Sequence, residues 1–512
     1  MTEAPLGIPG TVYLVGAGPG DPGLITLRGV QCLEQADVVL YDYLVNPAVV
    51  SHAADTARCI SLGSPSAGRA LTQNEINALM VEEARSGQTV VRLKGGDPSI
   101  FGRGADECEA LRVAGIPFEI VPGITTGIAV AAYCEIPVTH HLDASAVAFV
   151  AGRERGSKAT SALDYGALAA FPGTLILYMG VGRAEEWSTA LIGRGRSPET
   201  PVAIVRWGTC PQQEMVRCTL GTVARVIAER GLTPPSVFVV GDVVARAPAR
   251  SWFTARPLFG VRILVAGSSG TSEKLQNRLG TLGAEVLREP AIQITAPPDW
   301  APVDTALDAL GTYDWLVFAS PNGVDYFLQR LATRGGDVRR LAAVKLAAMG
   351  SGTAERLARH SLRADVVPEQ FVAESLAQEL TNRADGRRFL VARASRGRQV
   401  LADALRAAGA QVDEIVVYGN VDVEVPNPKV ASALADGRID WVAVTSSSVA
   451  RSLHQLYRDP LRRVRFASIG PITSATLREL GFEVAVEASP HSTDGLVAAV
   501  QAAVTDSGRE AP

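Results

Sequence analysis

Two glycine-rich turns contain the residues whose types and spacing most clearly suggest chemistry. The first is V-G-A-G-P-G-D at 15–21, and the second is L-K-G-G-D-P at 93–98 within V-V-R-L-K-G-G-D-P-S-I-F-G-R-G. Adjacent Gly95 and Gly96 let backbone groups approach a ligand closely, and Asp97 places a carboxylate beside them. Bare backbone next to a carboxylate suits a zwitterionic amino-acid moiety or a ribose better than a phosphate. The turns therefore predict a site for a small ligand that carries such groups.

The first turn taken alone permits two other interpretations. In a dinucleotide fingerprint, Gly16 and Gly18 would form the tight turn and Asp42 would be the acid that ends the second strand. That pattern requires glycine where the chain has Asp21, and Pro19 stiffens the loop that should cradle a pyrophosphate. A nicotinamide-dependent oxidoreductase and a purely structural turn remain alternatives, and Asp21 together with the second turn argues against the oxidoreductase.

The elements that must position these turns follow from the apolar periodicity, which alternates between strand and helix spacing. It predicts a βαβ unit at the start, a first lobe that ends near Pro137, a second α/β lobe over about 140–250 and an exit segment at 245–253. The predicted strands of these lobes lie at 11–15, 36–42, 89–93, 118–123, 146–151, 173–178, 201–206 and 236–241, and helices are predicted at 24–35, 104–114 and 124–134.

A further two-lobed α/β block is predicted after the exit segment. It opens with V-R-I-L-V-A-G at 261–267 and includes apolar strands at 315–320, 388–393 and 441–446. The strands that end at Ser320 and Ser446 each close on a small polar cluster, A-S-P-N-G-V and T-S-S-S-V-A. This echo is what two similar lobes would produce, although chance would produce it too.

Composition limits the class of protein. A chain of 512 residues predicts several domains, and 47% hydrophobic with 20% charged residues is the balance of a soluble globular protein. A net charge of -4 gives no electrostatic case for nucleic acid. The six cysteines show no C-x-x-C spacing, which argues against zinc or disulfides and favours a reducing cytoplasm. No apolar run reaches the ~18 residues of a membrane span. We expect a cytoplasmic protein without a metal site, a nucleic-acid partner or a membrane segment.

The first half resembles the uroporphyrinogen-III C-methyltransferases of the tetrapyrrole methylase superfamily over about 11–253. The resemblance rests on V-G-A-G-P-G-D-P-G-L-I-T, Y-D-Y-L-V, R-L-K-G-G-D-P-S-I-F-G-R-G, V-P-G-I-T-T and I-P-V-T-H, in this order. It implies two α/β lobes that hold S-adenosylmethionine between them, usually within a homodimer, and methylation of uroporphyrinogen III to precorrin-2, the entry to sirohaem and cobalamin. By motif, it assigns the cofactor contacts to Pro19, Gly95, Gly96, Asp97, Ile100, Thr125, Thr126, Met179 and Gly208.

The same resemblance assigns the general base of the reaction to Asp42, whose alternative role is to cap the turn after its strand. Two positions depart from the family pattern. Ser64 stands in L-G-S-P where a lysine in a V-G-K context is usual, and a hydroxyl is a far poorer proton donor. His141 in T-H-H replaces the arginine of T-H-R, which weakens an expected contact to a substrate carboxylate. Neither departure touches the residues assigned to the cofactor.

The second half resembles uroporphyrinogen-III synthase. The segments, in the family's order, are A-S-P-N-G-V, M-G-S-G-T-A, V-P-E-Q-F-V-A-E-S-L, E-I-V-V-Y, T-S-S-S-V and S-I-G-P-I-T-S-A-T-L-R-E-L-G. This family closes hydroxymethylbilane into uroporphyrinogen III without a cofactor, by positioning and hydrogen bonds. The resemblance makes Tyr418 the residue that assists the leaving hydroxyl. The residues expected to bind the substrate carboxylates, through hydroxyl and backbone N–H groups, are Ser320, Asn322, Gly323, Ser351, Thr353, Thr445, Ser446, Ser447 and Thr473.

Each of these synthase residues has a structural alternative, because strand-end serines and threonines are ordinary helix N-caps and Tyr418 could be a packed aromatic. The prediction is a two-lobed tetrapyrrole methylase fold followed by a two-lobed α/β uroporphyrinogen-III synthase fold. The expected domains are 1–256, with lobes at about 10–137 and 140–253, and 257–512, with one lobe at 260–296 plus 420–505 and the other at 297–419. The alternative for the second half is a tetrapyrrole-binding module without catalytic activity.

Overall fold

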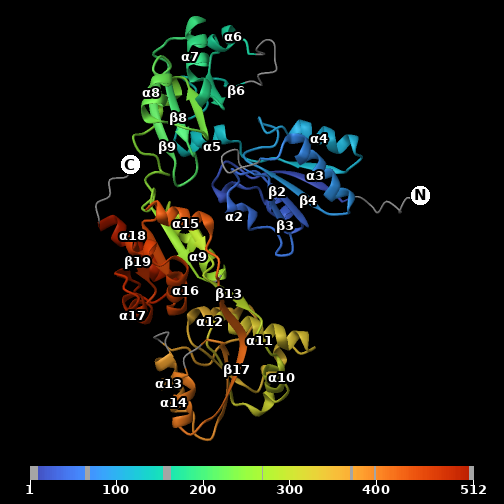
Figure 1. Cartoon of the computed structure of the whole chain (residues 1–512), viewed down its shortest axis with the longest axis vertical. Coiled ribbons are helices and arrows are strands. Elements are labelled where there is room, and N and C mark those ends of the chain that lie inside the picture. Colours follow the sequence, from blue (N-terminus) through green and yellow to red (C-terminus); the bar gives the residue numbers. More distant parts are fainter. Residues whose placement is uncertain are drawn as a thin grey trace, which may run out of the picture. The chain divides into compact units, whose positions relative to one another are not determined.

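The computed structural model describes residues 10–63, 70–153, 163–267, 269–368, 373–396 and 399–506, with only the backbone at 269–271. The chain divides into two compact units. The first consists mainly of Met1–Val261 with Leu282–Glu285, and the second of Arg262–Thr281 with Val286–Arg509. Within the described residues, each unit contains two five-stranded sheets flanked by helices (Figure 1). The predicted α/β fold class is therefore confirmed.

The first sheet of the N-terminal unit is parallel throughout, with the order β3-β2-β4-β1-β5. Its central strand β4, V-V-R-L-K, is buried along its whole length, including the charged residues Arg92 and Lys94. Parallel strands present their carboxyl ends at one edge, so the turns after β1 and β4 meet there. The elements are β1 Val12–Gly16, α1 Leu27–Glu34, β2 Val38–Tyr41, α2 Pro47–Val50, β3 Arg58–Ser61, α3 Gln73–Arg85, β4 Val90–Lys94, α4 Gly104–Val113, β5 Phe118–Val121 and α5 Thr126–Tyr133.

Helix α1 begins at Leu27 and not at about residue 24 as the periodicity predicts. Thr26 accepts a hydrogen bond from the Gly29 N–H and caps the helix. The residues just before it form a separate 3-10 turn, Pro22–Leu24, which Asp21 caps by accepting the Gly23 N–H. Two successive capping side chains thus divide the apolar pattern into two elements.

The second sheet of this unit is mixed, with the order β6-β7-β10-β8-β9. β6 and β7 are parallel, and β10 and β9 pair antiparallel to their neighbours. The edge strand β9 was not predicted, because its sequence E-M-V-R-C-T places charged residues among apolar ones. The elements are β6 Val147–Ala151, α6 Tyr165–Ala169, β7 Thr174–Tyr178, α7 Ala184–Gly193, β8 Pro201–Arg206, β9 Glu214–Thr219, α8 Val223–Arg230 and β10 Ser236–Val240.

The C-terminal unit has sheets of order β12-β11-β18-β19-β20 and β13-β17-β16-β14-β15. The chain passes from the first sheet to the second at β13 and returns through the long strand β17. The elements of the first sheet are β11 Arg262–Ala266, α9 Ser269–Thr281, β12 Glu285–Glu289, α15 Pro428–Ala435, β18 Trp441–Val444, α16 Ser447–Tyr457, β19 Arg465–Ser468, α17 Pro471–Glu479, β20 Val484–Glu487 and α18 Thr493–Asp506. Those of the second are β13 Ile292–Thr295, α10 Ala301–Asp308, β14 Trp315–Phe318, α11 Pro321–Thr333, β15 Lys345–Ala348, α12 Ser351–Arg359, α13 Ala373–Thr381, β16 Arg388–Ala394, α14 Val400–Ala407 and β17 Gln411–Asp422.

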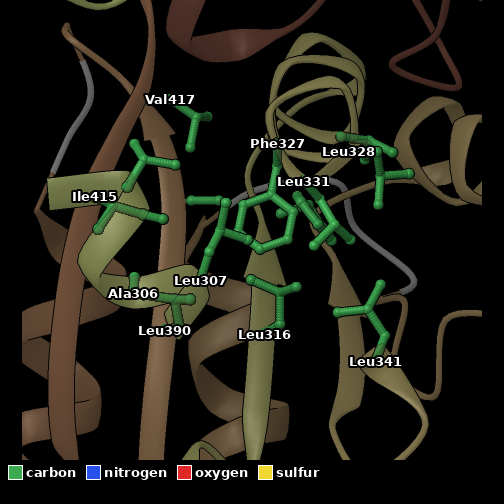
Figure 2. Packing of buried hydrophobic residues seen from close by; sticks show 14 of the residues in the cluster. Ala306, Leu307, Leu316, Phe327, Leu328, Leu331, Leu341, Leu390, Ile415 and Val417 are labelled. Carbon is green, nitrogen blue, oxygen red and sulfur yellow. The ribbon is translucent and has the colours of Figure 1, made fainter. Parts of the chain in front are cut away.

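A core of leucine, valine and phenylalanine side chains holds helices α10 and α11 against the second sheet of this unit. Phe327 of α11 is fully buried and lies among Leu307 of α10, Leu316 of β14 and Leu390 of β16 (Figure 2). Burying one such side chain contributes about 1.5–3 kcal/mol. The face of α11 that carries Phe327 is therefore fixed on the sheet, and this fixes where its N-terminus lies.

The two sheets of the C-terminal unit repeat one local arrangement. An aspartate precedes the tryptophan that opens β14 and β18. The Asp314 carboxylate accepts the Arg388 N–H at 2.9 Å, and that of Asp440 accepts the Arg262 N–H at 2.8 Å. Each strand is followed by a serine that caps the next helix, Ser320 for α11 and Ser446 for α16. The sequence echo at these serines therefore coincides with equivalent positions in the two sheets.

A search of the described residues for a helix both long and apolar enough to cross a membrane finds none.

Candidate functional site

The two glycine-rich turns are hydrogen-bonded to each other. The Gly18 N–H donates to the Gly96 carbonyl at 3.2 Å, and the Gly96 N–H donates to the Gly18 carbonyl at 2.7 Å. Both glycines have positive φ, +77° and +67°. Gly123 belongs to a third turn, after β5. A Cβ added to Gly16 would lie 2.6 Å from the Gly123 Cα, so only glycine fits where the first and third turns meet. Three turns thus converge with bare backbone at one edge of the first sheet.

A cavity of about 1430 Å³ opens beside these turns and is lined from both lobes of the N-terminal unit. Single small ligands usually occupy about 300–1,000 Å³, so the cavity has room for a cofactor and part of a second ligand. The predicted site residues that line it are Pro19, Asp42, Gly95, Gly96, Ile100, Thr125, Thr126, Met179 and Gly208. Their spread from Pro19 to Gly208 shows that the fold brings together residues from most of the unit.

Asp97 takes a different position from the other predicted cofactor residues and does not line the cavity. Its carboxylate accepts the Ser99 N–H at 2.7 Å and the Gly123 N–H at 2.9 Å. These bonds hold the second turn closed and tie it to the turn at Gly123. A direct contact from Asp97 to a ligand stays a prediction. Ser64, the position of the family's lysine, lies outside the described residues.

Tyr178 lines the cavity, although it was not among the predicted site residues. Its hydroxyl accepts the Gly127 N–H at 2.6 Å and shares a hydrogen bond of 2.7 Å with the Thr125 hydroxyl. Burial raises the pKa of this phenol, so it stays protonated at neutral pH. Tyr178 therefore connects β7 of the second lobe to the start of α5, where Thr125 and Thr126 meet the cavity. The sequence feature that could have identified Tyr178 as a site residue is its position beside Met179 in L-Y-M-G.

Strained backbone also concentrates at this cavity. Phe101, Met179 and Trp207 have φ values of 53°, 57° and 48°, and all three line the cavity. Such left-handed conformations at residues other than glycine cost about 1–3 kcal/mol each and cluster at functional sites. The sequence gives no sign of them. They indicate that the lining is held in place for a purpose other than stability.

Asp42 lies at the carboxyl end of β2 and lines the cavity with its side chain one-third exposed. Its Oδ1 accepts a hydrogen bond from Arg92 Nη2 at 2.6 Å, and its backbone N–H donates to the Leu93 carbonyl at 3.2 Å. Both the carboxylate and the backbone of Asp42 are thus held by β4. An immobilised carboxylate beside a cavity can accept a proton from a bound molecule.

The residues of the T-H-H segment lie apart from this lining. The His140 and His141 rings are 4.4 Å apart, and His140 Nδ1 is 3.2 Å from an Asp143 carboxylate oxygen. Asp143 also pairs with Arg246. Neither histidine lines the cavity. A substrate contact from His141 therefore has no support in this geometry.

The predicted residues of the C-terminal unit lie at the N-terminal ends of four helices that follow adjacent parallel strands. In one sheet, Ser320, Asn322 and Gly323 start α11, and Ser351 and Thr353 lie in the first turn of α12. In the other, Thr445, Ser446 and Ser447 start α16, and Thr473 lies in the first turn of α17. Free N–H groups and the helix dipole make such ends favourable for carboxylates.

Tyr418 meets the first of these clusters from β17. Its hydroxyl lies 3.0 Å from Ser320 Oγ, which in turn accepts the Gly323 N–H at 3.1 Å. The tyrosine is 6% exposed, and burial raises the pKa of its phenol. The group is therefore a protonated hydroxyl held at a helix end. A separate cavity of about 290 Å³ in this unit is lined by Lys274, Asn277, Arg278, Glu355, Thr493 and Asp494, and none of the predicted residues is among them.

Among the residues that the structure describes, no group of histidine, cysteine and acidic side chains could hold a metal ion. All six cysteines are free thiols, of which only Cys59 is exposed. Burial raises the pKa of Cys210, which partly lines the cavity, to about 12. This thiol is therefore protonated and a poor nucleophile at neutral pH.

Known protein families match the two halves of the chain separately. Residues 11–224 match the family described as Tetrapyrrole (Corrin/Porphyrin) Methylases, and residues 273–498 match Uroporphyrinogen-III synthase HemD. A relative named Porphyrin biosynthesis protein HemD, from Ruminiclostridium josui, is 33% identical over 93% of this chain and 95% of its own length.

Two further relatives bear the name of one activity each. A Uroporphyrinogen-III C-methyltransferase of Bacillus subtilis (strain 168) is 39% identical over 70% of this chain and 74% of its own length. An S-adenosyl-L-methionine-dependent uroporphyrinogen III methyltransferase of Methanosarcina barkeri (strain Fusaro / DSM 804) is 44% identical over 46% of this chain and 92% of its own length.

Fold, site and relatives together define a fused protein of two α/β families of tetrapyrrole biosynthesis. The chain belongs to the tetrapyrrole methylase family through its N-terminal half and to the uroporphyrinogen-III synthase family through its C-terminal half. The resemblance inferred from the motifs is confirmed for both halves.

Proposed function

We propose that the chain is a bifunctional enzyme of tetrapyrrole biosynthesis. Its C-terminal half cyclises hydroxymethylbilane to uroporphyrinogen III, and its N-terminal half methylates that product to precorrin-2 with S-adenosylmethionine. The observation that carries this proposal is the pair of glycine turns joined through Gly18 and Gly96 at the edge of a cavity of about 1430 Å³. A cavity of this size accommodates a methyl donor and a pyrrole ring of a large acceptor together.

The donor set of the cavity fits S-adenosylmethionine. Bare backbone at Gly95 and Gly96 accepts the close approach of a ribose or amino-acid group, and the N-terminal end of α5 at Thr126 suits a carboxylate. When bound, the cofactor supplies an electrophilic methyl group. The protein has then to bring a nucleophilic carbon into line and to exclude water.

Asp42 is the group proposed to accept the proton that the methylated macrocycle loses. It is the acidic residue at the end of β2 that lines the cavity, and Arg92 holds it in place. A positioned base of this kind contributes about 10²–10⁴-fold to a rate. The cofactor roles of Pro19, Ile100, Thr125, Met179 and Gly208, together with Asp97, belong to the same proposal.

In the C-terminal half, Tyr418 is the group proposed to donate a proton to the departing hydroxyl of hydroxymethylbilane. Its raised pKa keeps the phenol protonated, and Ser320 fixes its hydroxyl. The helix ends at Gly323, Thr353 and Ser446 offer N–H and hydroxyl donors to the substrate carboxylates. The boundary between the two catalytic halves is proposed at about 256/257.

We also propose that the enzyme is cytoplasmic and forms a homodimer through its methyltransferase half. The dimer is proposed from the resemblance to the tetrapyrrole methylases, which usually form homodimers. Sedimentation of the full-length chain tests this assignment. A monomer at micromolar concentration would contradict it.

Isothermal titration of the full-length chain tests the cofactor assignment. We expect S-adenosylmethionine to bind at one site per chain and NAD not to bind. Gly182→Ala is a matched control because Gly182 lines the cavity and a Cβ there would meet no atom within 4 Å. Binding of NAD in place of S-adenosylmethionine would contradict the proposal and favour an oxidoreductase.

A further inference from the structure

A buried cluster of charges lies between β4 and α4. Arg92 and Lys94 are two residues apart on β4 and therefore face the same side of the sheet, and each is 2% exposed. Glu107 of α4 is fully buried between them. Its carboxylate lies 3.0 Å from Arg92 Nε and 2.8 Å from Lys94 Nζ. Asp42 completes the cluster, so that two cations face two anions.

Arg92 uses all its nitrogen atoms within the protein. Nε donates to Glu107, Nη1 to the carbonyls of Leu93 at 3.1 Å and Leu40 at 3.5 Å, and Nη2 to Asp42 at 2.6 Å. Arg92 does not line the cavity. Its connection to any bound molecule therefore runs through the Asp42 carboxylate.

Stability alone is a weak reason for such a cluster. Removing charges from water costs several kcal/mol per ion, and apolar residues in their place are often as stable or more so. The strand that carries Arg92 and Lys94 is the centre of the sheet, where its other residues are valine and leucine. A rigid guanidinium held on three sides does, however, fix the direction of the Asp42 carboxylate, the member of this cluster that lines the cavity.

We propose that Arg92 is a positioning residue that orients Asp42 for proton removal. The inference rests on the proposed methyl transfer. In that reaction a carbon–hydrogen bond of the methylated macrocycle breaks, its electron pair stays in the ring system, and the proton forms a bond to an Asp42 carboxylate oxygen. No oxidant or reductant takes part. Arg92 acts by keeping that oxygen at its place.

A double-mutant cycle on the full-length enzyme tests the inference. Asp42→Asn is expected to lower kcat for methyl transfer about 10²–10⁴-fold. Arg92→Lys keeps the charge but loses the planar fork, and a misplaced base is expected to cost about 100-fold in kcat. In the Asp42→Asn background, Arg92→Lys is expected to cause no further loss, while KM and the Kd of S-adenosylmethionine stay within about twofold.

Lys94→Met is the matched control, because the Lys94 ammonium donates to Glu107 in the same cluster and acts on Asp42 only through its charge, without a hydrogen bond. Its effect on kcat is expected to multiply with that of Asp42→Asn. If Arg92→Lys also multiplies with Asp42→Asn, Arg92 is structural and the inference is overturned. Binding of S-adenosylmethionine shows whether each variant is folded. A wild-type chain that binds the cofactor but transfers no methyl group would instead refute the proposed function.

Discussion

Replacing Tyr178 by phenylalanine should weaken the connection between the two lobes of the methyltransferase half. The hydroxyl that is lost accepts the Gly127 N–H at 2.6 Å and bonds to the Thr125 hydroxyl at 2.7 Å. The threonine can rotate to another partner, but the backbone N–H cannot. A buried donor left without a partner costs about 1–3 kcal/mol. We therefore expect the free energy of unfolding of this half to fall by about 1–3 kcal/mol.

Calorimetry of the full-length chain measures this loss. The transition of the methyltransferase half is the one that S-adenosylmethionine shifts to higher temperature, because the cofactor binds only the folded state. For a folded region of 150–250 residues, each 1 kcal/mol corresponds to about 2–4 °C, so Tyr178→Phe should lower this Tm by about 2–12 °C. If the conformation that binds S-adenosylmethionine becomes less stable by 1.4 kcal/mol, the Kd of the cofactor should rise about tenfold.

Tyr43→Phe is the matched control, because Tyr43 lines the same cavity but is 51% exposed, and its hydroxyl makes no hydrogen bond to the residues that the structure describes. Its free energy of unfolding should change by no more than about 0.5 kcal/mol, the range of ordinary surface substitutions, and its Tm should stay close to that of the wild type. Equal shifts for the two variants, or no shift for Tyr178→Phe, would refute the reasoning from the buried N–H.

Three further substitutions test other parts of the structure. Gly208→Ala would place a Cβ 2.1 Å from Val130 Cγ1 beside the cavity, so we expect a loss of about 1–3 kcal/mol in stability and loss of cofactor binding by titration. Tyr418→Phe should slow enzymatic formation of uroporphyrinogen III about 10²–10⁴-fold, measured by isomer-resolving chromatography. Arg330→Met removes the partner that lowers the pKa of the Asp304 carboxyl. That carboxylate stabilises the fold above its unfolded pKa and ceases to do so as the pH falls. The variant should therefore have a lower Tm than wild type at pH 7, and the difference should narrow as the pH falls below about 4 and through the lowered pKa of the folded state.

Controls separate these effects from general damage. Gly182→Ala should retain cofactor binding, because a Cβ there meets no neighbour within 4 Å. Tyr326→Phe changes a tyrosine whose ring stacks 5.9 Å from that of Tyr418, and it should leave the synthase rate nearly unchanged. A difference in Tm for Arg330→Met that is the same at pH 7 and pH 3 would contradict the role of the ion pair.

Local patterns were sufficient to predict much of the fold. The strand predicted at 201–206 is β8, Pro201–Arg206, because its apolar run is bounded by a proline and by a turn. The glycines of the two turns were identified for the same reason, since their spacing after buried strands is a local property. Strand β9 could not be identified, because only its pairing with β8 makes E-M-V-R-C-T a strand.

The candidate site was predicted less completely, because its contacts join distant residues. The hydroxyl of Tyr178 reaches Gly127 across 51 positions, and Arg92 reaches Asp42 across 50. No periodicity or motif encodes such pairs. The resemblance assigns Asp97 to the cofactor, and that contact stays a prediction; the motif did not show that its carboxylate accepts the N–H groups of Ser99 and Gly123. Motif resemblance identifies which residue types matter but does not identify the partner that each one contacts.

The central claim is that one chain carries out two successive steps, and one measurement tests it most directly. The purified full-length chain is given hydroxymethylbilane with and without S-adenosylmethionine, and the products are separated by isomer and identified by mass. We expect uroporphyrinogen III without the donor and its dimethylated product, precorrin-2, with the donor. Accumulation of the non-enzymatic isomer I alone, with no methylated product, would contradict the account.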